Sequence, residues 1–390
     1  SFVPDIEADG DGFYSSYDID DSNPYLTSEY PHIVDANTIN YVFEGNLEDF
    51  VGNEVYSLGD IDNDSLEDIL IGGDGISYVL TGQTLTNLYD ENQTTIIGPS
   101  DVDYIFLIEP TGRSGIKSGD IDNDGRDDIL FENHLFLSAN LTSSTSLTTN
   151  DADYEIGGTW AGDVDGDGLD DILSGSSLYL GKNLDYFHLS TVADYYFTGD
   201  AYSVGDVDGD GKNDMFVNPN QLILGSSLGS NINITTSDYT FINGNSNHNI
   251  VVTAGDVDND GKSDFLIGNL NSRTTYIIFG AELGPYSEIN LLNTTHFTGR
   301  EVSFGDAIAS SGDIDGDGYD DFIISDTDIT RQINENGNNW TEYRGIAYLY
   351  TGVVNCVAQQ CDASQYSLTI VYGPDTSDLF GESVSTAGDI

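Results

Sequence analysis

Basic residues are scarce in this chain. Its 390 residues include only 10 Lys and Arg against 68 Asp and Glu, so the formal net charge is -58 at pH 7. A surface this acidic repels nucleic-acid phosphates and anionic membranes, and we expect neither as a partner. The sequence also lacks an apolar run long enough to span a bilayer, so we expect no membrane insertion.

Cysteine is nearly absent. Cys356 and Cys361 are separated by four residues. This spacing allows either a small disulfide loop in an oxidising compartment or two buried thiols, and we favour the disulfide. The chain begins at Ser1, with neither a Met nor a basic and apolar leader, which indicates a processed or trimmed start. These features favour an extracellular or cell-surface location.

Side chains arranged for catalysis are lacking as well. The five histidines are scattered without metal-ligand spacing. The segment 225–229 matches the nucleophile-elbow pattern, but no helical pattern follows it, so we interpret it as a turn. Acidic pairs such as Asp127 and Asp128 fall inside a repeated acidic loop, which gives them a role other than that of glycosidase carboxylates. We expect no enzymatic activity.

What the chain has in abundance is one acidic loop of nine residues. The first copy reads DIDNDSLED and the fourth reads DVDGDGKND, and positions 1, 3, 5 and 9 are aspartate in every complete copy. Six complete copies begin at Asp60, Asp120, Asp163, Asp206, Asp256 and Asp313, and a seventh begins at Asp389. A repeat this regular is typical of a propeller or solenoid.

Carboxylates at this spacing are the chemistry of calcium, which takes six to eight oxygen ligands. Without a cation, four carboxylates within nine residues would repel one another. We therefore predict about six calcium ions, held by the four aspartates of each loop and by the backbone carbonyl at position 7. The predicted ligands are Asp60, Asp62, Asp64, Leu66 and Asp68; Asp120, Asp122, Asp124, Arg126 and Asp128; Asp163, Asp165, Asp167, Leu169 and Asp171; Asp206, Asp208, Asp210, Lys212 and Asp214; Asp256, Asp258, Asp260, Lys262 and Asp264; and Asp313, Asp315, Asp317, Tyr319 and Asp321.

The loops are not EF-hands. An EF-hand needs an acidic residue at position 12, and the residues there are Ile71, Phe131, Ser174, Val217, Ile267 and Ile324. A short apolar run follows each loop instead, and a second run follows that one after a few turn residues. Such runs predict buried strands. Each unit then consists of strand, cation loop, strand, turn and strand, with one more strand before the next loop, which is a four-stranded propeller blade.

The repeat resembles the FG-GAP repeat of integrin α-subunit β-propellers and their microbial relatives. The resemblance rests on the acidic loops and on the pairs Phe304-Gly305 and Phe380-Gly381 ahead of the last two loops, and it covers residues 41–390. It implies an all-β, seven-bladed propeller of four-stranded antiparallel blades, with calcium loops on one face and partner binding on the other. The seventh blade is incomplete in this sequence: either residues 1–59 supply strands to it or more chain follows Ile390, and we expect more chain.

Two places depart from this pattern. Ser65 stands where the other five complete loops have Gly, at a position that often needs a positive φ, so the first site is expected to be strained or weaker. Residues 1–40 form an acidic N-terminal segment, of which 7–24 resemble an acidic metal-binding repeat found beside propellers in bacterial surface proteins. Asp9, Asp11, Asp18, Asp20 and Asp21 would form an extra cation site there, or the segment is a solvated linker. One or two ions beyond the six are expected in this segment or beyond Ile390.

The sequence thus predicts a calcium-stabilised extracellular module for binding or adhesion, with a protein or glycan on a surface as its ligand. Trp340 and Tyr343, in what looks like a loop too long for a plain hairpin, are the expected contact surface. One alternative is a structural subunit of an extracellular fibre or surface layer, which would self-associate. A second is the propeller domain of a polysaccharide lyase or hydrolase.

Overall fold

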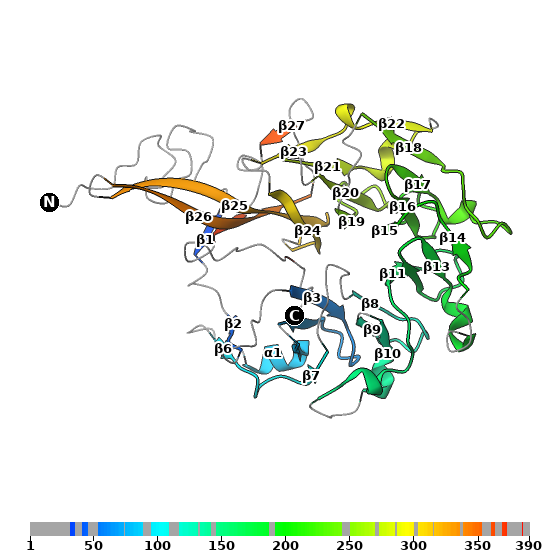
Figure 1. Ribbon diagram of the computed structural model, residues 1–390, viewed down its shortest axis with the longest axis horizontal. Coiled ribbons are helices and arrows are strands. Elements are labelled where there is room, and N and C mark those ends of the chain that lie inside the picture. Colours follow the sequence, from blue (N-terminus) through cyan, green and yellow to red (C-terminus); the bar gives the residue numbers. More distant parts are fainter. Residues whose placement is uncertain are drawn as a thin grey trace.

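The structure, a computed structural model, is an all-β propeller whose blades follow one another around a central axis (Figure 1). It describes residues 32–35, 41–45, 54–73, 75–88, 95–108, 117–131, 133–141, 146–186, 192–243, 250–269, 273–284, 287–299, 303–314, 316–335, 338–352, 360–362, 369–372 and 384. Six blades are present in these residues. The prediction of a propeller is confirmed, whereas a seventh blade stays a prediction.

Each blade is a small antiparallel sheet built in sequence order from the inside outward. The first contains β3 (Glu54–Gly59), β4 (Asp68–Gly72), β5 (Ser77–Leu80) and β7 (Tyr104–Phe106). The second contains β8 (Lys117–Gly119), β9 (Asp128–Phe131) and β10 (His134–Phe136), with Tyr154 bridged to Leu135 in place of an outer strand. The third contains β11 (Thr159–Gly162), β12 (Asp171–Ser174), β13 (Ser177–Tyr179) and β14 (Tyr195–Tyr196).

The other three blades repeat this plan. The fourth contains β15 (Ala201–Gly205), β16 (Asp214–Val217), β17 (Gln221–Ile223) and β18 (Tyr239–Ile242). The fifth contains β19 (Ile250–Gly255), β20 (Asp264–Asn269), β21 (Thr274–Ile278) and β23 (His296–Thr298). The sixth contains β24 (Phe304–Gly312), β25 (Asp321–Glu335), β26 (Asn338–Tyr350) and β28 (Thr369–Tyr372). Every acidic loop joins the first and second strands of its blade.

Short helices and crossing strands connect the blades. After the third strand come α1 (Gly82–Leu88) and the 3-10 helices η2 (Ser138–Asn140), η4 (Gly181–Tyr186), η5 (Gly225–Ser227) and η6 (Gly280–Glu282). Two more single turns are η3 (Thr149–Asp151) and η7 (Leu291–Asn293). The remaining strands are β1 (His32–Asp35), β2 (Tyr41–Phe43), β6 (Thr95–Ile97), β22 (Glu288–Asn290) and β27 (Gln360–Asp362).

The hydrophobic core lies between adjacent blades. Between the fourth and fifth blades, Phe216, Phe241 and Phe265 are at most 2% exposed, and the Phe241 and Phe265 rings meet edge to face at 6.0 Å. Tyr78 and Tyr350, on the third strands of the first and sixth blades, are fully buried as well. Side chains at alternate positions of the second and third strands fill these interfaces, because successive residues of a strand point to opposite faces of the blade.

One long hairpin corrects a prediction. Residues 336–344 were expected to form a loop too long for a hairpin, but β25 and β26 continue as paired strands from Ile329, opposite Arg344, to Glu335, opposite Asn338. The hairpin extends beyond the other strands of its blade (Figure 1). The strand pattern of this segment is polar, so it lacked the apolar run by which the inner strands were recognised.

Several predictions lie outside the described residues. They include the carboxylates of residues 1–24, the Phe380-Gly381 pair, Asp389 and Cys356, and with Cys356 the disulfide. The division between residues 40 and 41 stays a prediction, although β1, on its N-terminal side, pairs with β28 of the sixth blade. None of the described helices is long and apolar enough to cross a membrane.

Candidate calcium loops

The aspartate at position 1 shapes each loop. In the first loop, Asp60 Oδ1 accepts a hydrogen bond from the Asp64 amide at 2.9 Å, and Oδ2 accepts one from the Ser65 amide at 2.8 Å. The same pair of bonds recurs on Asp120, Asp163, Asp206, Asp256 and Asp313. The sequence folds into this turn because position 1 supplies acceptors for backbone amides that no strand pairs.

The aspartate at position 9 joins the loop to the sheet. Asp68 Oδ2 accepts a bond from the Ile61 amide and Oδ1 one from the Gly82 amide, both at 2.8 Å. The equivalent aspartates make the same two bonds in the other five loops: Asp128, Asp171, Asp214, Asp264 and Asp321. All six are 0% exposed. Position 9 therefore holds the fold together besides being a predicted ligand.

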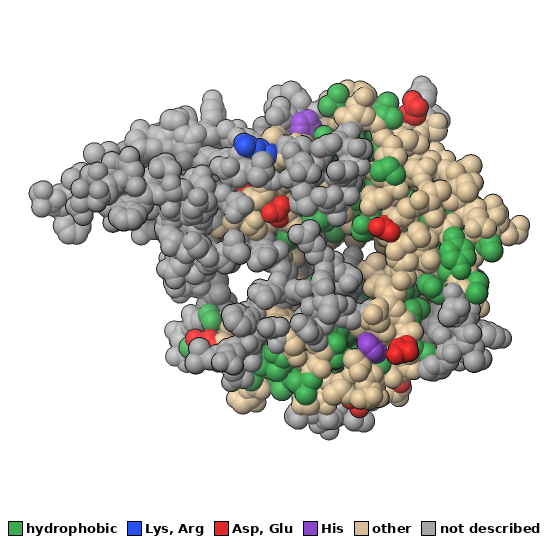
Figure 2. All heavy atoms as spheres, in the orientation of Figure 1, with side chains coloured by type: hydrophobic (Ala, Val, Ile, Leu, Met, Phe, Trp, Pro, Cys, Tyr) green, Lys and Arg blue, Asp and Glu red, His purple; other side chains and the backbone are tan. Residues whose placement is uncertain are grey.

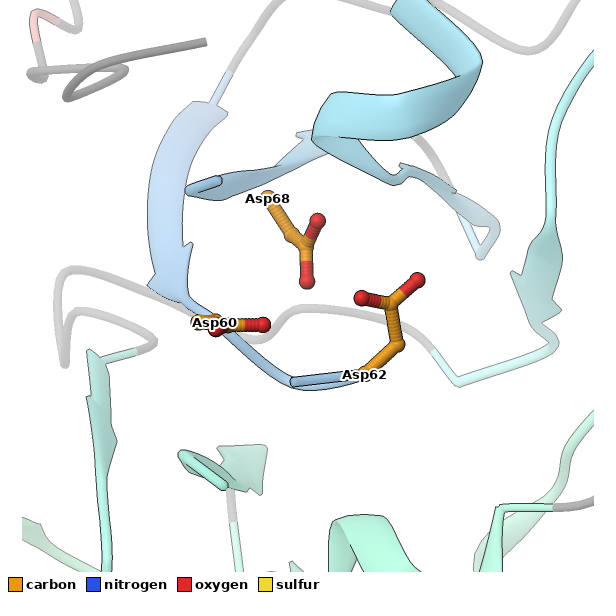
Figure 3. A group of neighbouring side chains, drawn as sticks. All are labelled: Asp60, Asp62 and Asp68. Atoms are coloured by element: carbon orange, nitrogen blue, oxygen red, sulfur yellow. The ribbon is translucent and has the colours of Figure 1, made fainter. Parts of the chain in front are cut away.

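Carboxylates converge in five of the loops. In the first, one oxygen each from Asp60, Asp62 and Asp68 lies within 4.8 Å of the others, and Figure 3 shows the three side chains pointing toward a shared space. The second loop forms the same group, and in the other three the group consists of positions 1, 3 and 5. These groups are Asp120, Asp122 and Asp128; Asp163, Asp165 and Asp167; Asp206, Asp208 and Asp210; and Asp256, Asp258 and Asp260.

Buried oxygens without partners show that the loops suit a cation. Oδ1 of Asp62, of Asp165 and of Asp258 is buried and accepts no hydrogen bond. An anionic oxygen in this situation is costly unless a cation or proton joins it. Calcium, which binds oxygens of carboxylates, would satisfy all three. The residues present therefore fit the ion, and they would contribute negative charge and oxygen ligands on a preformed turn.

The pKa values of the loop aspartates are raised by burial and by neighbouring carboxylates. Burial, with smaller contributions from neighbouring carboxylates, raises the pKa of Asp62, Asp122, Asp208 and Asp258. Burial also raises the pKa of the position-9 aspartates to about 7, although their two backbone hydrogen bonds act in the opposite direction: Asp68, Asp128, Asp171, Asp214 and Asp264. A bound divalent cation would favour the ionised form at each of these positions.

The third loop already contains a cation from the protein itself. The Lys182 ammonium, at the start of η4, forms an ion pair with Asp165 and lies 3.8 Å from Asp167 Oδ2. The corresponding position in other blades is Gln83, Ala139, Ser226 or Ala281. The ammonium contacts Oδ2 of Asp165, and the oxygen of this loop without a partner is Oδ1 of the same carboxylate.

The remaining predicted ligands are placed only in part. Asp315 of the sixth loop lies outside the described residues, so that loop has only its hydrogen-bonded frame. At position 7, the amides of Leu66, Arg126, Leu169, Lys212, Lys262 and Tyr319 donate to the position-5 aspartate. Ligation by the carbonyls of these residues stays a prediction.

Position 8 has a role that the sequence did not reveal. Asp127 of the second loop accepts a 2.9 Å bond from the Asp60 amide of the first, and Asp320 likewise accepts a 2.7 Å bond from the Asp256 amide. In the third and fourth loops, Asp170 and Asn213 make similar contacts to the preceding blade. Backbone bonds accompany them, from position 8 to the preceding position-1 carbonyl. Each of the first five loops is thus tied to the next blade.

A second overlooked feature is an aspartate just before the outer strand. Asp103, Asp153, Asp194 and Asp238 accept bonds of 2.8 to 2.9 Å from the backbone amide that follows the third strand of their own blade. The signal was available, because an Asp-Tyr pair recurs at 103–104, 153–154, 194–195 and 238–239. These four aspartates explain part of the acidity that calcium loops alone leave unexplained.

Other candidate residues have structural surroundings. Ser227, in the elbow-like sequence, lies in η5 and donates to Asp238 Oδ1 at 2.8 Å. His134 and His296 lie on β10 and β23, and His296 Nδ1 is 3.1 Å from the Thr294 carbonyl. On the face in Figure 2, acidic side chains lie at separate places around the ring and not in one patch.

Comparison with known proteins gives little further guidance. No protein-family model matches the chain, and no curated protein sequence matches it. Among solved structures, it is similar to the crystal structure of the V. cholerae biofilm matrix protein Bap1, with a TM-score of 0.34 and 13% identity. The match covers 76% of this chain but only 47% of that one. A likeness at this level assigns no function to the chain.

Proposed function

We propose that this protein is a calcium-stabilised, extracellular binding or adhesion module built on an FG-GAP-type propeller. The observation that supports it is the convergence of carboxylates in loop after loop, with buried oxygens that lack a partner in the first, third and fifth loops. Calcium sites of extracellular modules are typically weak and fill in a calcium-rich medium, and the proposal places this protein in such a medium. The module binds a protein or glycan on a surface and carries out no turnover.

Calcium in this proposal stabilises the scaffold that presents the binding surface. An ion that binds only the folded state raises its stability by mass action, and several sites add their contributions. Because every loop joins the inner strand of a blade to its second strand and contacts the adjacent blade, each ion would fix both a loop and an interface between blades. Removing calcium should therefore loosen the whole ring.

The first experiment is thermal unfolding of the protein in calcium, in magnesium and in excess EDTA. We expect EDTA to lower the melting temperature by many degrees and calcium, but not magnesium, to restore it, because magnesium dehydrates reluctantly and demands octahedral geometry. An unchanged melting temperature in EDTA would rule out the calcium sites.

A triple variant tests whether the stabilisation by calcium arises at the acidic loops. Asp62→Asn, Asp165→Asn and Asp258→Asn together remove one charge from each of three loops at the oxygens without partners. We expect about half of the calcium-dependent stabilisation to disappear, because three of the six predicted sites lose a ligand carboxylate. The matched control, Glu155→Gln, Asp200→Asn and Glu288→Gln, removes three charges from exposed side chains outside the loops. If the control loses as much, general charge repulsion and not calcium ligation is responsible.

Binding itself is tested with the calcium-loaded protein on protein-coated and glycan-coated surfaces. Adhesion that EDTA and the triple variant both abolish supports the proposal. Sedimentation in calcium identifies the alternative, since growth into larger particles without adhesion would favour a structural subunit.

A further inference from the structure

Outer strands in this propeller are paired on both edges. On one edge the outer strand pairs antiparallel with the third strand of its own blade, as β18 does with β17. On the other edge a strand that crosses from the following blade pairs parallel with it: β22 with β18, and β27 with β23. Isolated parallel bridges, Phe106 to Leu147 and Tyr196 to Asn233, mark the same contact in other blades.

The segment from His32 to Phe43 fits this scheme twice. Its first strand, β1, pairs parallel with β28, the outer strand of the sixth blade, and so takes the place of a crossing strand. Its second strand, β2, pairs parallel with β6, the crossing strand of the first blade, and so takes the place of an outer strand. Nine residues separate the starts of β1 and β2, as they do for β6 and β7 and for β27 and β28.

Packing of Phe43 supports the same placement. In the described blades, a phenylalanine of the outer strand contacts an aromatic ring of the next blade, as Phe106 does with Phe131 at 5.5 Å and Phe297 with Phe322 at 5.4 Å. Phe43 packs on the first blade in the same manner, 5.1 Å from Tyr78, in a cluster that includes Leu80 and Ile97.

The sequence of β2 is also that of an outer strand. It reads Tyr-Val-Phe, against Tyr-Ile-Phe in β7 and Tyr-Thr-Phe in β18. Pairing, spacing, packing and sequence therefore agree without reference to the calcium loops.

We infer that residues 32–43 are the crossing strand and outer strand of a seventh blade, which lies between the sixth blade and the first. In the part of the chain that the structure describes, β2 pairs with β6 alone, so its other edge is the surface on which a third strand docks. The occupant is a β-hairpin of the blade type: an aspartate followed by three apolar residues, a short turn and an apolar strand. The other blades identify it, since such a hairpin contacts the outer strands β7, β14, β18, β23 and β28.

A hairpin from this chain tests the inference. The probe is a synthetic peptide of residues 206–224, which contains the fourth acidic loop with β16 and β17. We expect it to bind the 390-residue protein one to one in calcium, to raise its melting temperature, and to slow hydrogen exchange of the Val42 and Phe43 amides about tenfold or more. A control peptide with Phe216→Asp and Leu222→Asp keeps the loop but loses the apolar strands, and should not bind.

A fused version removes the entropic cost of association. Residues 208–224 are appended after Ile390, so that the hairpin continues from Asp389 and Ile390. The same protection of Val42 and Phe43 is expected, and Phe43→Ala should weaken the gain in melting temperature, whereas Ile96→Ala, at an exposed position of β6, should not. If neither the peptide nor the fusion protects β2, the inference is wrong. Measuring calcium-dependent melting in parallel keeps this outcome distinct from failure of the proposed function.

Discussion

At the scale of single residues, the aspartates of a loop have different structural roles. Position 1 folds the turn through backbone amides, and position 9 fixes the turn to the sheet. Position 3 is left with a buried oxygen that has no protein partner in the first, third and fifth loops. A motif of four aspartates therefore contains two side chains with structural hydrogen bonds and a third, at position 3, one oxygen of which accepts no hydrogen bond in three of the loops.

The backbone at position 6 offers a test. Ser65 has φ of +70°, as the departure from Gly predicted, while Gly168 has +89° and no heavy atom within 4 Å of where its Cβ would stand. We expect Ser65→Gly to tighten calcium binding in the first loop and to stabilise the protein by at most about 1 kcal/mol, because a side chain in the left-handed region costs about that much.

The reverse change, Gly168→Ser, should destabilise the third loop by a similar amount. Calorimetry of calcium binding and thermal unfolding of both variants measure the two effects. Equal and opposite shifts agree with backbone strain as the cause, whereas a loss of stability in both would contradict it.

At the scale of elements, each acidic loop packs against the end of the first strand of the preceding blade, and this contact joins the two blades. The glycine ahead of each of the first five loops is required because the position-8 side chain of the next loop fills the place of its Cβ: Asp127 does so at Gly59, and Asn213 at Gly162. Among the described residues, nothing lies within 4 Å of that place at Gly312, ahead of the sixth loop. Contact between blades thus explains why a glycine precedes position 1 of these loops.

Two glycines, one just ahead of the fifth loop and one within it, allow backbone strain to be measured separately from contact between blades. Gly255 has φ of +78° and its Cβ would overlap the Asp320 carboxylate, whereas Gly261 has φ of +87° with open space around it. Gly255→Ala should cost at least about 3 kcal/mol, because overlap adds to strain, and Gly261→Ala only about 1 kcal/mol. Urea unfolding measures both variants, and similar losses would show that contact between the blades is unimportant.

At the scale of the whole molecule, negative charge is the main influence on how stability depends on pH and calcium. The chain has a formal charge of -58, and its buried position-9 aspartates are ionised only against the cost of burial. Without calcium, protons are the remaining counter-charge.

Stability without calcium should therefore fall as the pH rises. The folded-state pKa of Asp68, Asp128, Asp171, Asp214 and Asp264 is about 7, above the usual value of 3.8, so the folded state binds more protons than the unfolded state between these limits. This stabilisation is complete below about pH 4 and is lost as the pH passes 7.

Calorimetry in EDTA from pH 5 to pH 8 should show a falling melting temperature, with a smaller slope in calcium because the ion keeps the carboxylates charged. A rising curve in EDTA would contradict the burial of these groups.

The sequence by itself determined the repeat, and through it most of the fold. Aspartates at fixed spacing are local chemistry, and the apolar runs after them predicted the second and third strands, which is where β4, β5, β16 and β17 lie. The consequence of Ser in place of Gly at position 65 could also be predicted from the sequence, because the allowed range of φ depends on the residue type.

Only the tertiary structure decided how the blades meet. The bonds of Asp127 and Asp320 to preceding loops join residues more than 60 positions apart, and nothing in the spacing of one loop predicts them. The pairing of β1 with β28 spans nearly the whole chain. A contact between distant segments depends on how all the blades pack together. The conformation of a nine-residue loop depends mainly on its own residues and the hydrogen bonds among them.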